Sequence, residues 1–381
     1  MIPRPTVLEI DLVAAAGNVR AARRMVGAER KIYAVVKADA YGHGAAELGA
    51  TFLANGADAL AVADLGEGIR LRQRGITGPI LVYPNALPEA APEALAHGLT
   101  PALVDLESAD AYAKAATGPC EIFVKVDVGL ERLGVPAEQA VKTIIAMLEL
   151  PHLRLGGLCG HPHVPGGDDA AYAEWQLNRF TSVVDELEAR GVRVPIRLLA
   201  ASPFVLRFPQ TYLNAVDPGR MLYGIAYASE KPPADLRPTL RALTSRLITV
   251  KELAPRERFA ELAPFPVTGP MRLGVIPMGS ADGLLWLHAG HVLVRGRKAP
   301  LVSGPNLEHT RIDLTGVPDA RVGDEVVIIG RQGDAEISTA EVAGRHGIGL
   351  HHVATTVGPR VARVYFSGGV PVKTITPADG L

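Results

Sequence analysis

The sequence predicts an α/β fold, a (β/α)8 TIM-type barrel followed by a C-terminal, mainly β domain. One observation is that short apolar segments recur through the first 230 residues with amphipathic helical patterns between them. The other is that the helical pattern fades beyond about Glu230 and turn-separated strand patterns follow. The chain has 381 residues, 48% of them hydrophobic, and is longer than a chain that folds around one hydrophobic core usually is. We therefore expect two domains.

The first strand is expected around Val7 to Leu12, before the barrel. The segments between the later strands show apolar residues at spacings of three and four, most clearly from Ala137 to Leu150 and from Ala170 to Arg190, which predicts helices. Strands and helices that alternate in this number are typical of a closed parallel barrel. The eight barrel strands are expected, in order, in KIYAVVKA, ALAVAD, PILVYP, TPALVD, EIFVKVD, LRLGGLCGH, IRLLAAS and LNAVDPG.

A linker is predicted at Pro232 and Pro233, where the chain leaves the barrel. Beyond it, LTSRLITVKEL, HVLVRG and DEVVIIG are strand candidates separated by turns. We therefore expect residues 9–230 to form the barrel. Residues 231–381, together with the N-terminal strand at residues 1–8, are expected to form the β domain.

The amino-acid composition indicates which kinds of binding partner to expect. The 39 basic and 40 acidic residues nearly cancel and no basic block occurs, so we expect neither nucleic acid nor a membrane surface as partner. Cys120 and Cys159 are too few for a disulfide framework, and the N-terminus lacks the pattern of a leader segment. No uninterrupted run of about 18 apolar residues occurs, so no helix is expected to span a membrane. A cytoplasmic protein that binds a small molecule or another copy of itself fits best.

The decapeptide VVKADAYGHG places Lys37 where an apolar strand opens into a polar loop. In barrels of this type, catalytic groups lie at the C-terminal ends of strands. A partly buried lysine there could form a Schiff base with an aldehyde cofactor, whereas most lysines at strand ends are merely solvated. Tyr41 and His43 follow closely, which favours a functional role. Other polar residues expected at strand ends are Asp64, Lys125, His161, Ser202 and Asp217.

The string VVKADAYGHG resembles the cofactor-lysine signature of alanine racemases, which are fold-type III pyridoxal phosphate enzymes. The resemblance continues in KVDVGLERLGV, LYG, ADG, VLVRGRKAPLV and VGDEVVIIGRQGD and so covers essentially the whole chain. It implies pyridoxal 5'-phosphate as cofactor, bound as an aldimine by Lys37, whose amine then removes the α-proton of a small amino acid. It also implies a head-to-tail homodimer in which the β domain completes the partner's active site. No metal is expected.

The resemblance assigns Tyr41 to the cofactor phosphate, with a tyrosine packed at the barrel rim as the alternative. The Ser202 hydroxyl and the backbone amides of Gly219 and Arg220 would form the phosphate corner common in barrels, and Tyr223 of the LYG string would also contact the cofactor. Ser202 could instead be a helix N-cap.

Three further roles follow from the resemblance. Arg132 would organise the substrate carboxylate, with a surface ion pair as the alternative. Lys125 would orient that arginine, either carbamylated as in some members or uncarbamylated and paired with Asp127. His161 would pack on the pyridine ring, although His163 follows closely in the sequence.

Two departures from the family pattern concern catalysis. Asp217 occupies the position of an arginine that donates to the pyridine nitrogen in racemases. An acidic group there favours a protonated ring and a persistent carbanion, which suits decarboxylation, aldol cleavage or β-elimination. In addition, Ser280 replaces the tyrosine of the GYADG motif that acts as the second base. A serine hydroxyl is a poor base unless another group activates it.

The segment SGPNLEHTRIDL also differs from the family, which implies an altered substrate pocket. Asn306 is a candidate substrate-binding residue, and Glu308 or His309 could supply the missing second acid or base. The alternative is that Glu308 and His309 are a charged pair beside a strand. Asp282 and the stretch from Asn306 to His309 would lie near the partner's cofactor.

Three functions are consistent with these features. An amino-acid racemase of the alanine racemase family, with Lys37, Ser280 and His309 as catalytic residues, is favoured by the similarity over the whole chain. A pyridoxal phosphate-dependent lyase on the same scaffold is favoured by Asp217 and Ser280. A non-catalytic cofactor carrier is disfavoured because Lys37 and the phosphate loop are both retained.

Overall fold

The computed structural model describes residues 4–164, 169–256, 258 and 260–379. The chain divides into two compact units. The first, called the barrel unit here, contains Ala14–Ala40 and Gly44–Arg237. The second, called the β unit, contains the described residues up to Val13, Tyr41–His43, and those from Pro238 onwards.

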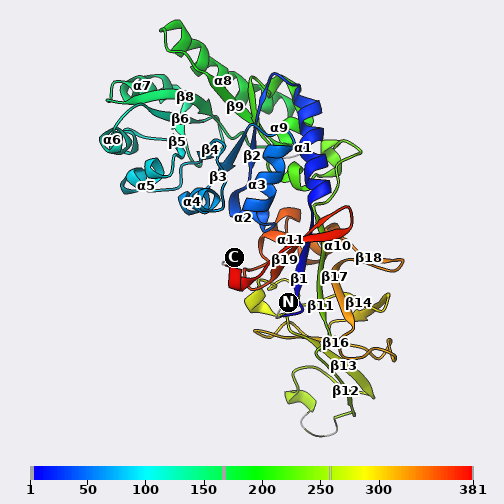
Figure 1. The fold of residues 1–381 in the computed structure, drawn as a ribbon. Coiled ribbons are helices and arrows are strands. Elements are labelled where there is room, and N and C mark those ends of the chain that lie inside the picture. The colour runs from blue at the N-terminus through cyan, green and yellow to red at the C-terminus, as the bar shows by residue number, and fades with distance from the viewer. Residues whose placement is uncertain (1–3, 165–168, 257, 259, 380–381) are drawn as a thin grey trace. The chain divides into compact units, whose positions relative to one another are not determined.

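The barrel unit contains eight parallel strands in the order β5-β4-β3-β2-β10-β9-β8-β6, and the pairing of β5 with β6 closes the ring (Figure 1). Each strand coincides with one of the eight predicted segments, so the predicted barrel is confirmed. The two-residue strand β7 (Val135–Pro136) pairs with β6 outside the ring. The barrel strands are β2 (Lys31–Val35), β3 (Ala59–Val62), β4 (Ile80–Val82), β5 (Thr100–Leu103), β6 (Cys120–Asp127), β8 (Leu153–Cys159), β9 (Ile196–Ala201) and β10 (Ala215–Asp217).

Helices follow the strands as the apolar spacing predicts. The two clearest predictions are confirmed, with ends that differ by one or two residues: α7 (Ala137–Leu148) and α8 (Ala170–Ala189). Two helices lie in this unit except for their end residues Leu12, Val13 and Tyr41: α1 (Leu12–Val26) and α2 (Lys37–Tyr41). The other helices of the unit are α3 (Ala45–Ala54), α4 (Leu65–Gln73), α5 (Ala91–Ala96), α6 (Leu106–Ala115) and α9 (Ser202–Arg207), with the 3-10 turns η1 (Pro88–Ala90), η2 (Pro209–Thr211), η3 (Arg220–Tyr223) and η4 (Ala228–Glu230).

Asp64, one of the polar residues expected at a strand end, has a structural role. It is the N-cap of α4, where its side chain accepts from the backbone N–H of Glu67 and the Glu67 side chain accepts from the backbone N–H of Asp64. This reciprocal capping satisfies two backbone donors that the helix cannot pair internally.

Apolar side chains hold α7 and α8 against the barrel. Ile122 and Val124 of β6, Leu158 of β8, Ile144 of α7 and Phe180 of α8 are fully buried and belong to one cluster. Burial of side chains of this size contributes about 1.5–3 kcal/mol each.

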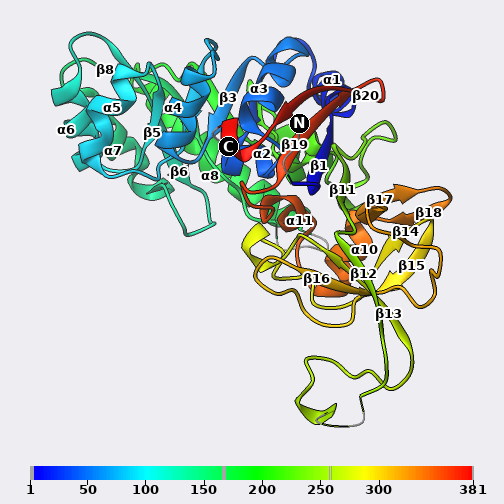
Figure 2. The ribbon, with the colours of Figure 1, turned by 60° about the horizontal axis from the view of Figure 1, so that its bottom comes forward.

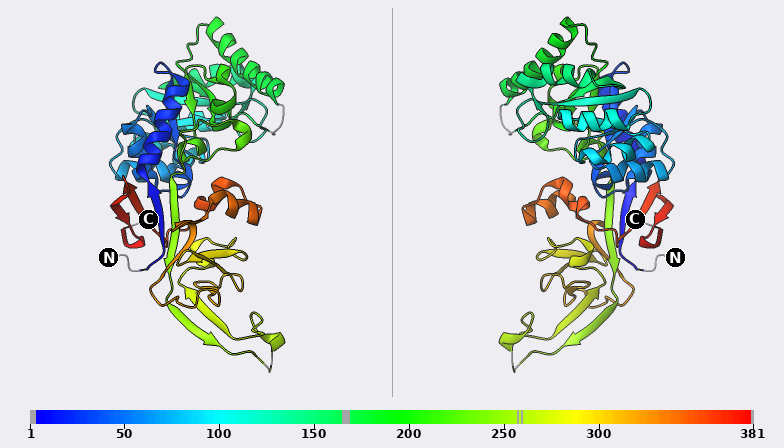
Figure 3. Two further views of the ribbon diagram at one scale, coloured as in Figure 1. Left: turned by 90° about the vertical axis from the view of Figure 1, so that its right-hand side faces the viewer. Right: turned by 90° about the vertical axis from the view of Figure 1, so that its left-hand side faces the viewer.

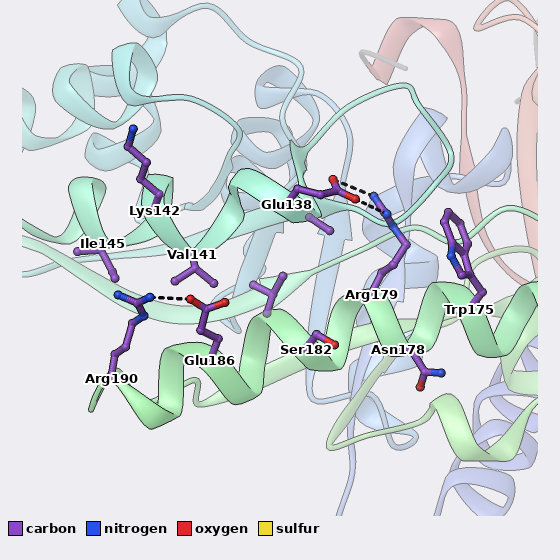
Figure 4. Close-up of a pocket in the computed structure, with 12 residues that line it drawn as sticks. Glu138, Val141, Lys142, Ile145, Trp175, Asn178, Arg179, Ser182, Glu186 and Arg190 are labelled. Carbon is purple, nitrogen blue, oxygen red and sulfur yellow. Dashed lines mark hydrogen bonds and ion pairs between the residues drawn. The ribbon is translucent and has the colours of Figure 1, made fainter.

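The outer faces of α7 and α8 border a groove of about 670 Å³. Figure 4 shows two ion pairs in it, Glu138 with Arg179 and Glu186 with Arg190. Its lining side chains come from these two helices and from Arg190, which follows α8, and not from strand ends. The groove is therefore no candidate for catalysis in a barrel, where catalytic groups gather at the ends of strands.

The β unit contains a sheet in the order β15-β14-β17-β11-β1-β19-β20, with β18 paired to β17, and a second sheet in the order β12-β13-β16 (Figure 2). Strand β1 lies antiparallel to β11 and parallel to β19. The strands are β1 (Val7–Asp11), β11 (Leu240–Arg246), β12 (Thr249–Leu253), β13 (Met271–Ile276), β14 (His291–Val294), β15 (Arg297–Pro300), β16 (Thr310–Asp313), β17 (Glu325–Gln332), β18 (Ala335–Ile337), β19 (Ala362–Ser367) and β20 (Val370–Ile375).

Short helices complete the β unit. They are α10 (Thr339–His346) and α11 (Leu350–Thr355), with the 3-10 turns η5 (Ala260–Leu262), η6 (Ser280–Asp282) and η7 (Pro377–Asp379).

The predicted strand LTSRLITVKEL is wrong as a single strand. The backbone N–H of Leu247 donates to Asp324 beside the first sheet, whereas that of Ile248 donates to Val275 of β13 in the second. The segment therefore forms the end of β11 and the start of β12, and the hairpin of β12 and β13 extends away from the larger sheet (Figure 3). Within the described part of the chain, no helix is long and apolar enough to cross a membrane.

Candidate active site

The C-terminal ends of the barrel strands surround a pocket of about 270 Å³. This volume is near the lower end of the roughly 300–1,000 Å³ common for small-molecule sites. The pocket brings together five residues that the sequence predicts for the site: Lys37, Lys125, Arg132, His161 and Asp217. The remaining lining residues are Ala63, Tyr83, Pro84, Asn85, Leu133 and Gly160.

Lys37 begins an unusual turn, α2. Ala38, Asp39, Ala40 and Tyr41 all have φ between 51° and 55°, the left-handed region that non-glycine residues rarely adopt. Such residues cost roughly 1–2 kcal/mol each. A strained backbone of this kind persists only where its surroundings over-determine it.

Hydrogen bonds around Asp39 hold this turn. The backbone N–H of Asp39 donates to the Glu67 carboxylate (3.1 Å), and the Asp39 side chain accepts from Ala45 N–H (2.8 Å). The Asp39 carbonyl accepts from Gly44 N–H (2.9 Å). Glu67 is buried on α4, so helix α4 directly supports the turn that carries Lys37.

We expect Glu67→Ala to lower the free energy of unfolding by about 1–3 kcal/mol, because it leaves the partly buried Asp39 N–H without its Glu67 acceptor and removes half of the α4 cap. Urea denaturation followed by circular dichroism measures this change. Glu89→Ala, which removes an exposed carboxylate, is the matched control. Equal midpoints for the two variants would contradict the support assigned to Glu67.

The pocket is rich in positive charge, with Lys37, Lys125 and Arg132 in its wall. Burial lowers the pKa of the Lys37 ammonium; Arg132 and Lys125 lower it further, and the Asp217 carboxylate opposes them. The amine is consequently closer to its neutral, nucleophilic form than an exposed lysine would be.

His161 lies in the pocket, whereas the neighbouring His163 is exposed and binds Gln176 through its backbone. Burial lowers the pKa of His161 to about 3, and the positive charges of Lys125, Lys37 and Arg132 act in the same direction. The imidazole therefore stays neutral at ordinary pH.

Asp217 is the last residue of β10 and is buried. Its Oδ2 accepts from the Tyr83 hydroxyl at 2.5 Å, and its Oδ1 is buried with no hydrogen-bond partner among the described residues. Burial raises the pKa of this carboxyl to about 6, while the hydrogen bond from Tyr83 and the charges of Lys125 and Lys37 favour the ionised form.

The Asp217 pKa predicts a pH effect on stability. The pKa of this carboxyl is about 6 in the folded protein and 3.8 in the unfolded chain, so well below pH 3.8 it is neutral in both states. As pH rises from about 4 to about 6, the unfolded chain releases the proton more readily than the folded protein, and the free energy of unfolding therefore falls. The shift corresponds to about 3 kcal/mol. In cofactor-free protein, Asp217→Asn should therefore be up to about 3 kcal/mol more stable than wild type at pH 7.5 and little different at pH 4.

Urea unfolding of both proteins at the two pH values checks this prediction. Asp185→Asn, which neutralises an exposed carboxylate on α8, is the control and should not change the pH dependence. A constant difference between wild type and Asp217→Asn at both pH values would contradict the prediction.

The predicted alternative that pairs Lys125 with Asp127 is wrong, because no salt bridge joins them in the described structure. Asp127 Oδ1 accepts instead from the backbone N–H groups of the loop residues Gly129, Leu130 and Glu131. Lys125 Nζ lies 5.6 Å from the centre of the Tyr83 ring.

The loop that Asp127 shapes also carries Arg132. The alternative of a surface ion pair for Arg132 is wrong as well, because within the described ranges Arg132 has no carboxylate partner and lines the pocket. Its guanidinium is therefore available to an anionic ligand.

Ser202 is the first residue of α9, but its side chain does not cap that helix, so the N-cap alternative is wrong. Its hydroxyl oxygen accepts from the backbone N–H groups of Gly219 (2.9 Å) and Met221 (3.2 Å). These two bonds occupy the acceptor capacity of the hydroxyl and leave its hydrogen to be donated. Ser202 is thus a donor held in place by the turn that follows β10.

The predictions for Gly219 and Tyr223 need correction. The Gly219 N–H is donated to Ser202, so of the two predicted backbone donors only the Arg220 N–H remains for an anion, and the Arg220 side chain forms a buried ion pair with Glu230. Tyr223 is buried in the core, where its hydroxyl donates to the Val35 carbonyl at 2.8 Å and its ring packs edge-on to Phe52. Tyr223 supports the strand before Lys37 and is not among the residues that line the pocket.

In the β unit, the structure places Ser280 next to the segment from Asn306 to His309. Ser280 N–H donates to the Asn306 carbonyl and Ala281 N–H to the Leu307 carbonyl, both at 2.9 Å, and Asn306 N–H donates to the His309 carbonyl at 2.8 Å. Gly279 is required here, since a Cβ would lie 2.3 Å from the Asn306 carbonyl oxygen.

Ion pairs stabilise the region around Ser280 and the segment from Asn306 to His309. Asp282 is fully buried and pairs with Arg4, and Arg360 lies within ion-pair distance of both Asp282 (3.8 Å) and Glu308 (2.6 Å). The hydrogen bond from Arg360 lowers the pKa of Glu308. Glu308 is therefore a poor proton donor, and its charged partner is Arg360 rather than His309.

Comparison with known proteins decides the family. The family description "Alanine racemase, N-terminal domain" matches residues 10–227, and "Alanine racemase, C-terminal domain" matches residues 240–365. The chain belongs to the alanine racemase family. Both the predicted membership and the predicted combination of barrel and β domain are confirmed.

Named members of the family align over nearly the whole chain. The alanine racemase of Methanococcus maripaludis is 34% identical over 373 residues, with 96% of this chain and 100% of the relative covered. The alanine racemase of Desulfosudis oleivorans is 36% identical over 376 residues, with 94% and 96% covered. These relatives support an enzyme with a racemase-type function and give no support to the lyase alternative.

Solved structures of the family agree with the fold. The alanine racemase from Bacillus anthracis with bound L-Ala-P superposes with a TM-score of 0.92 at 29% identity and covers 99% of both chains. That of Clostridium difficile 630 gives a TM-score of 0.90 at 29% identity and covers 99% of this chain and all of the other.

Two polar residues of the pocket, Tyr83 and Asn85, are not among those predicted from the sequence. Tyr83 and Asn85 follow β4 and line the pocket. Their place after a barrel strand was a usable signal, because the end of PILVYP is such a position. The residue types alone do not indicate a site, because tyrosine and asparagine after a strand are also ordinary loop residues.

Proposed function

We propose that this chain is a pyridoxal 5'-phosphate-dependent amino-acid racemase of the alanine racemase family. Lys37 binds the cofactor covalently and exchanges the α-proton on one face of the substrate. The single observation that carries the proposal is the pocket at the strand ends, where a lysine with a lowered pKa and a buried carboxylate with an unpaired oxygen both line the wall.

The residues present fit this cofactor. Lys37 supplies the amine, the unpaired Oδ1 of Asp217 accepts a hydrogen bond from a ring N–H, and the Ser202 hydroxyl donates to a phosphate oxygen. Arg220 supplies a backbone N–H group beside Ser202, whereas the Gly219 N–H is already donated to the Ser202 hydroxyl. Tyr41 is proposed as a further phosphate ligand. Bound pyridoxal phosphate withdraws electrons from the α-carbon of an amino acid and so acidifies its α-proton.

Different residues of the pocket are proposed to bind the substrate, hold the cofactor ring and transfer the proton. Arg132, free of an ion pair among the described residues, binds the substrate carboxylate, and Lys125 beside it adds positive charge or, once carbamylated, orients it. Neutral His161 would pack against the cofactor ring without competing for a proton. Lys37 accepts and returns the proton, because its lowered pKa makes the free amine accessible.

The second face of the substrate needs another acid or base. We propose Ser280 or His309 for this role, with Asn306 as a substrate contact, since the backbone of the β unit joins these residues. Glu308 is not preferred, because its ion pair with Arg360 lowers its pKa and makes it both a poor acid and a weaker base. We further propose a head-to-tail homodimer in the cytoplasm, in which these residues complete the partner's site, and a small amino acid as substrate.

Incubation of the cofactor-loaded protein with single L- or D-amino acids in deuterated water tests the proposal, with proton NMR and chiral chromatography as readouts. Deuterium at the α-carbon together with the opposite enantiomer is the expected result. Exchange with retained configuration, or loss of the carboxylate or side chain, would contradict racemisation.

A further inference from the structure

One hydrogen bond of the pocket crosses the mouth of the barrel. Tyr83 follows β4 and Asp217 ends β10, and in the ring β3 and β2 lie between these two strands. The Tyr83 hydroxyl nevertheless donates to Asp217 Oδ2 at 2.5 Å. Both side chains line the pocket, so this bond belongs to its wall.

The bond engages only one oxygen of the carboxylate. Asp217 Oδ1 is buried and has no partner within the described residues. A buried polar atom without a partner costs free energy unless a ligand pairs with it. The Tyr83 bond also restricts rotation of the carboxylate and so favours one direction for Oδ1 before any ligand binds.

The surrounding groups act on the charge of Asp217 in two directions. Burial opposes ionisation, whereas Tyr83, Lys125 on β6 and Lys37 after β2 favour it. Among the described residues, the pocket lining also contains His161, which is neutral, and Arg132. Cys159 at the end of β8 lies close by, and burial raises its pKa to about 12. Tyr83 is the side-chain hydrogen-bond donor that opposes the cost of burying the carboxylate, and a backbone hydrogen bond of Asp217 itself acts in the same direction.

We propose that Tyr83 is a positioning residue that aims Asp217 Oδ1 at the cofactor's pyridine nitrogen and keeps the shared proton on that nitrogen. The inference rests on the proposed function. A hydrogen bond to a carboxylate favours its charged form and makes it a weaker base. With Tyr83 in place, Asp217 stays charged beside a protonated ring; without it, the carboxylate is the stronger base and takes the proton.

Pyridoxal phosphate labelled with ¹⁵N in the ring reports this proton directly, because protonated and unprotonated pyridine nitrogens have different chemical shifts. We expect the protonated shift in the wild-type protein between pH 6 and 9 and the unprotonated shift in Asp217→Asn. Tyr83→Phe should move the resonance from the first position toward the second. Tyr212→Phe is the matched control, since it removes a buried hydroxyl bonded to the Val205 carbonyl outside the pocket lining.

A Tyr83→Phe protein with the wild-type nitrogen shift at every pH would overturn the positioning role. Borohydride reduction followed by peptide mass spectrometry tests the proposed function separately. Absence of the cofactor on the Lys37 peptide would contradict that function, whereas cofactor on Lys37 with an unchanged shift in Tyr83→Phe would contradict only the role of Tyr83.

If Tyr83→Phe does not fold, a more conservative substitution at position 83 tests the same inference. Site-specific 3-fluorotyrosine at position 83 keeps the ring and makes the hydroxyl a stronger donor. In cofactor-free protein with ¹³C-labelled aspartate, the titration midpoint of the Asp217 carboxyl should then fall below that of the wild type. An unchanged or higher midpoint would overturn the inference.

Discussion

Replacement of Lys37 by alanine is expected to abolish both covalent cofactor binding and racemisation. The lysine would supply the amine that binds the cofactor and the base on one face of the substrate, and loss of a positioned base alone costs about 10² to 10⁴ in rate. The combined loss should exceed about 10³ in kcat. Cofactor absorbance after gel filtration and chiral chromatography of the product measure the two effects.

Lys142→Ala, which removes an exposed lysine on α7, serves as the control and should leave both readouts unchanged. Added methylamine offers a further check, because a small amine can restore the missing base if the pocket of Lys37→Ala is otherwise intact. An active Lys37→Ala protein that retains cofactor absorbance without added amine would exclude the assignment of Lys37.

Replacement of Arg132 by alanine should raise KM for the amino acid by about 10- to 100-fold, since a charge-assisted hydrogen bond contributes about 1.5–3 kcal/mol. Arg132 lines the pocket without a carboxylate partner among the described residues, so a substrate carboxylate can take that place. Arg132→Lys keeps the charge but loses the two-pronged geometry, and its KM should lie between those of wild type and Arg132→Ala.

Steady-state kinetics with both enantiomers measure this effect. Arg190→Ala is the control, because it removes an arginine that pairs with Glu186 on the outer face of α8. A normal KM in Arg132→Ala would show that the substrate carboxylate binds elsewhere.

Most of the fold could be read from local sequence patterns. The eight barrel strands and the helices α7 and α8 are each short periodic segments, and their alternation alone predicts a closed parallel ring. The failure at LTSRLITVKEL has a non-local cause. Leu247 and Ile248 bond to residues 77 and 27 positions away in two different sheets, and apolar periodicity carries no information about the sheet to which a strand belongs.

In the candidate site, too, some features follow from local sequence patterns and others depend on non-local contacts. The strand-end rule located Lys37, Lys125, His161 and Asp217, because parallel strands carry their C-terminal residues to one edge whatever the sequence between them. The predicted roles of Ser202 and Tyr223 needed the structure. The Ser202 hydroxyl meets backbone groups 17 and 19 residues later, and the Tyr223 hydroxyl meets a carbonyl 188 residues earlier.

The sequence alone thus determined the family, the architecture and the identity of the pocket's charged residues, because these depend on motifs and on periodicities that are local in the chain. Only the tertiary structure decided what each charged or polar group contacts. It separated Lys125 from Asp127, paired Glu308 with Arg360 and joined Tyr83 to Asp217 across 134 residues. Hydrogen bonds and pKa values depend on distance and burial, which the folded chain sets and sequence spacing does not.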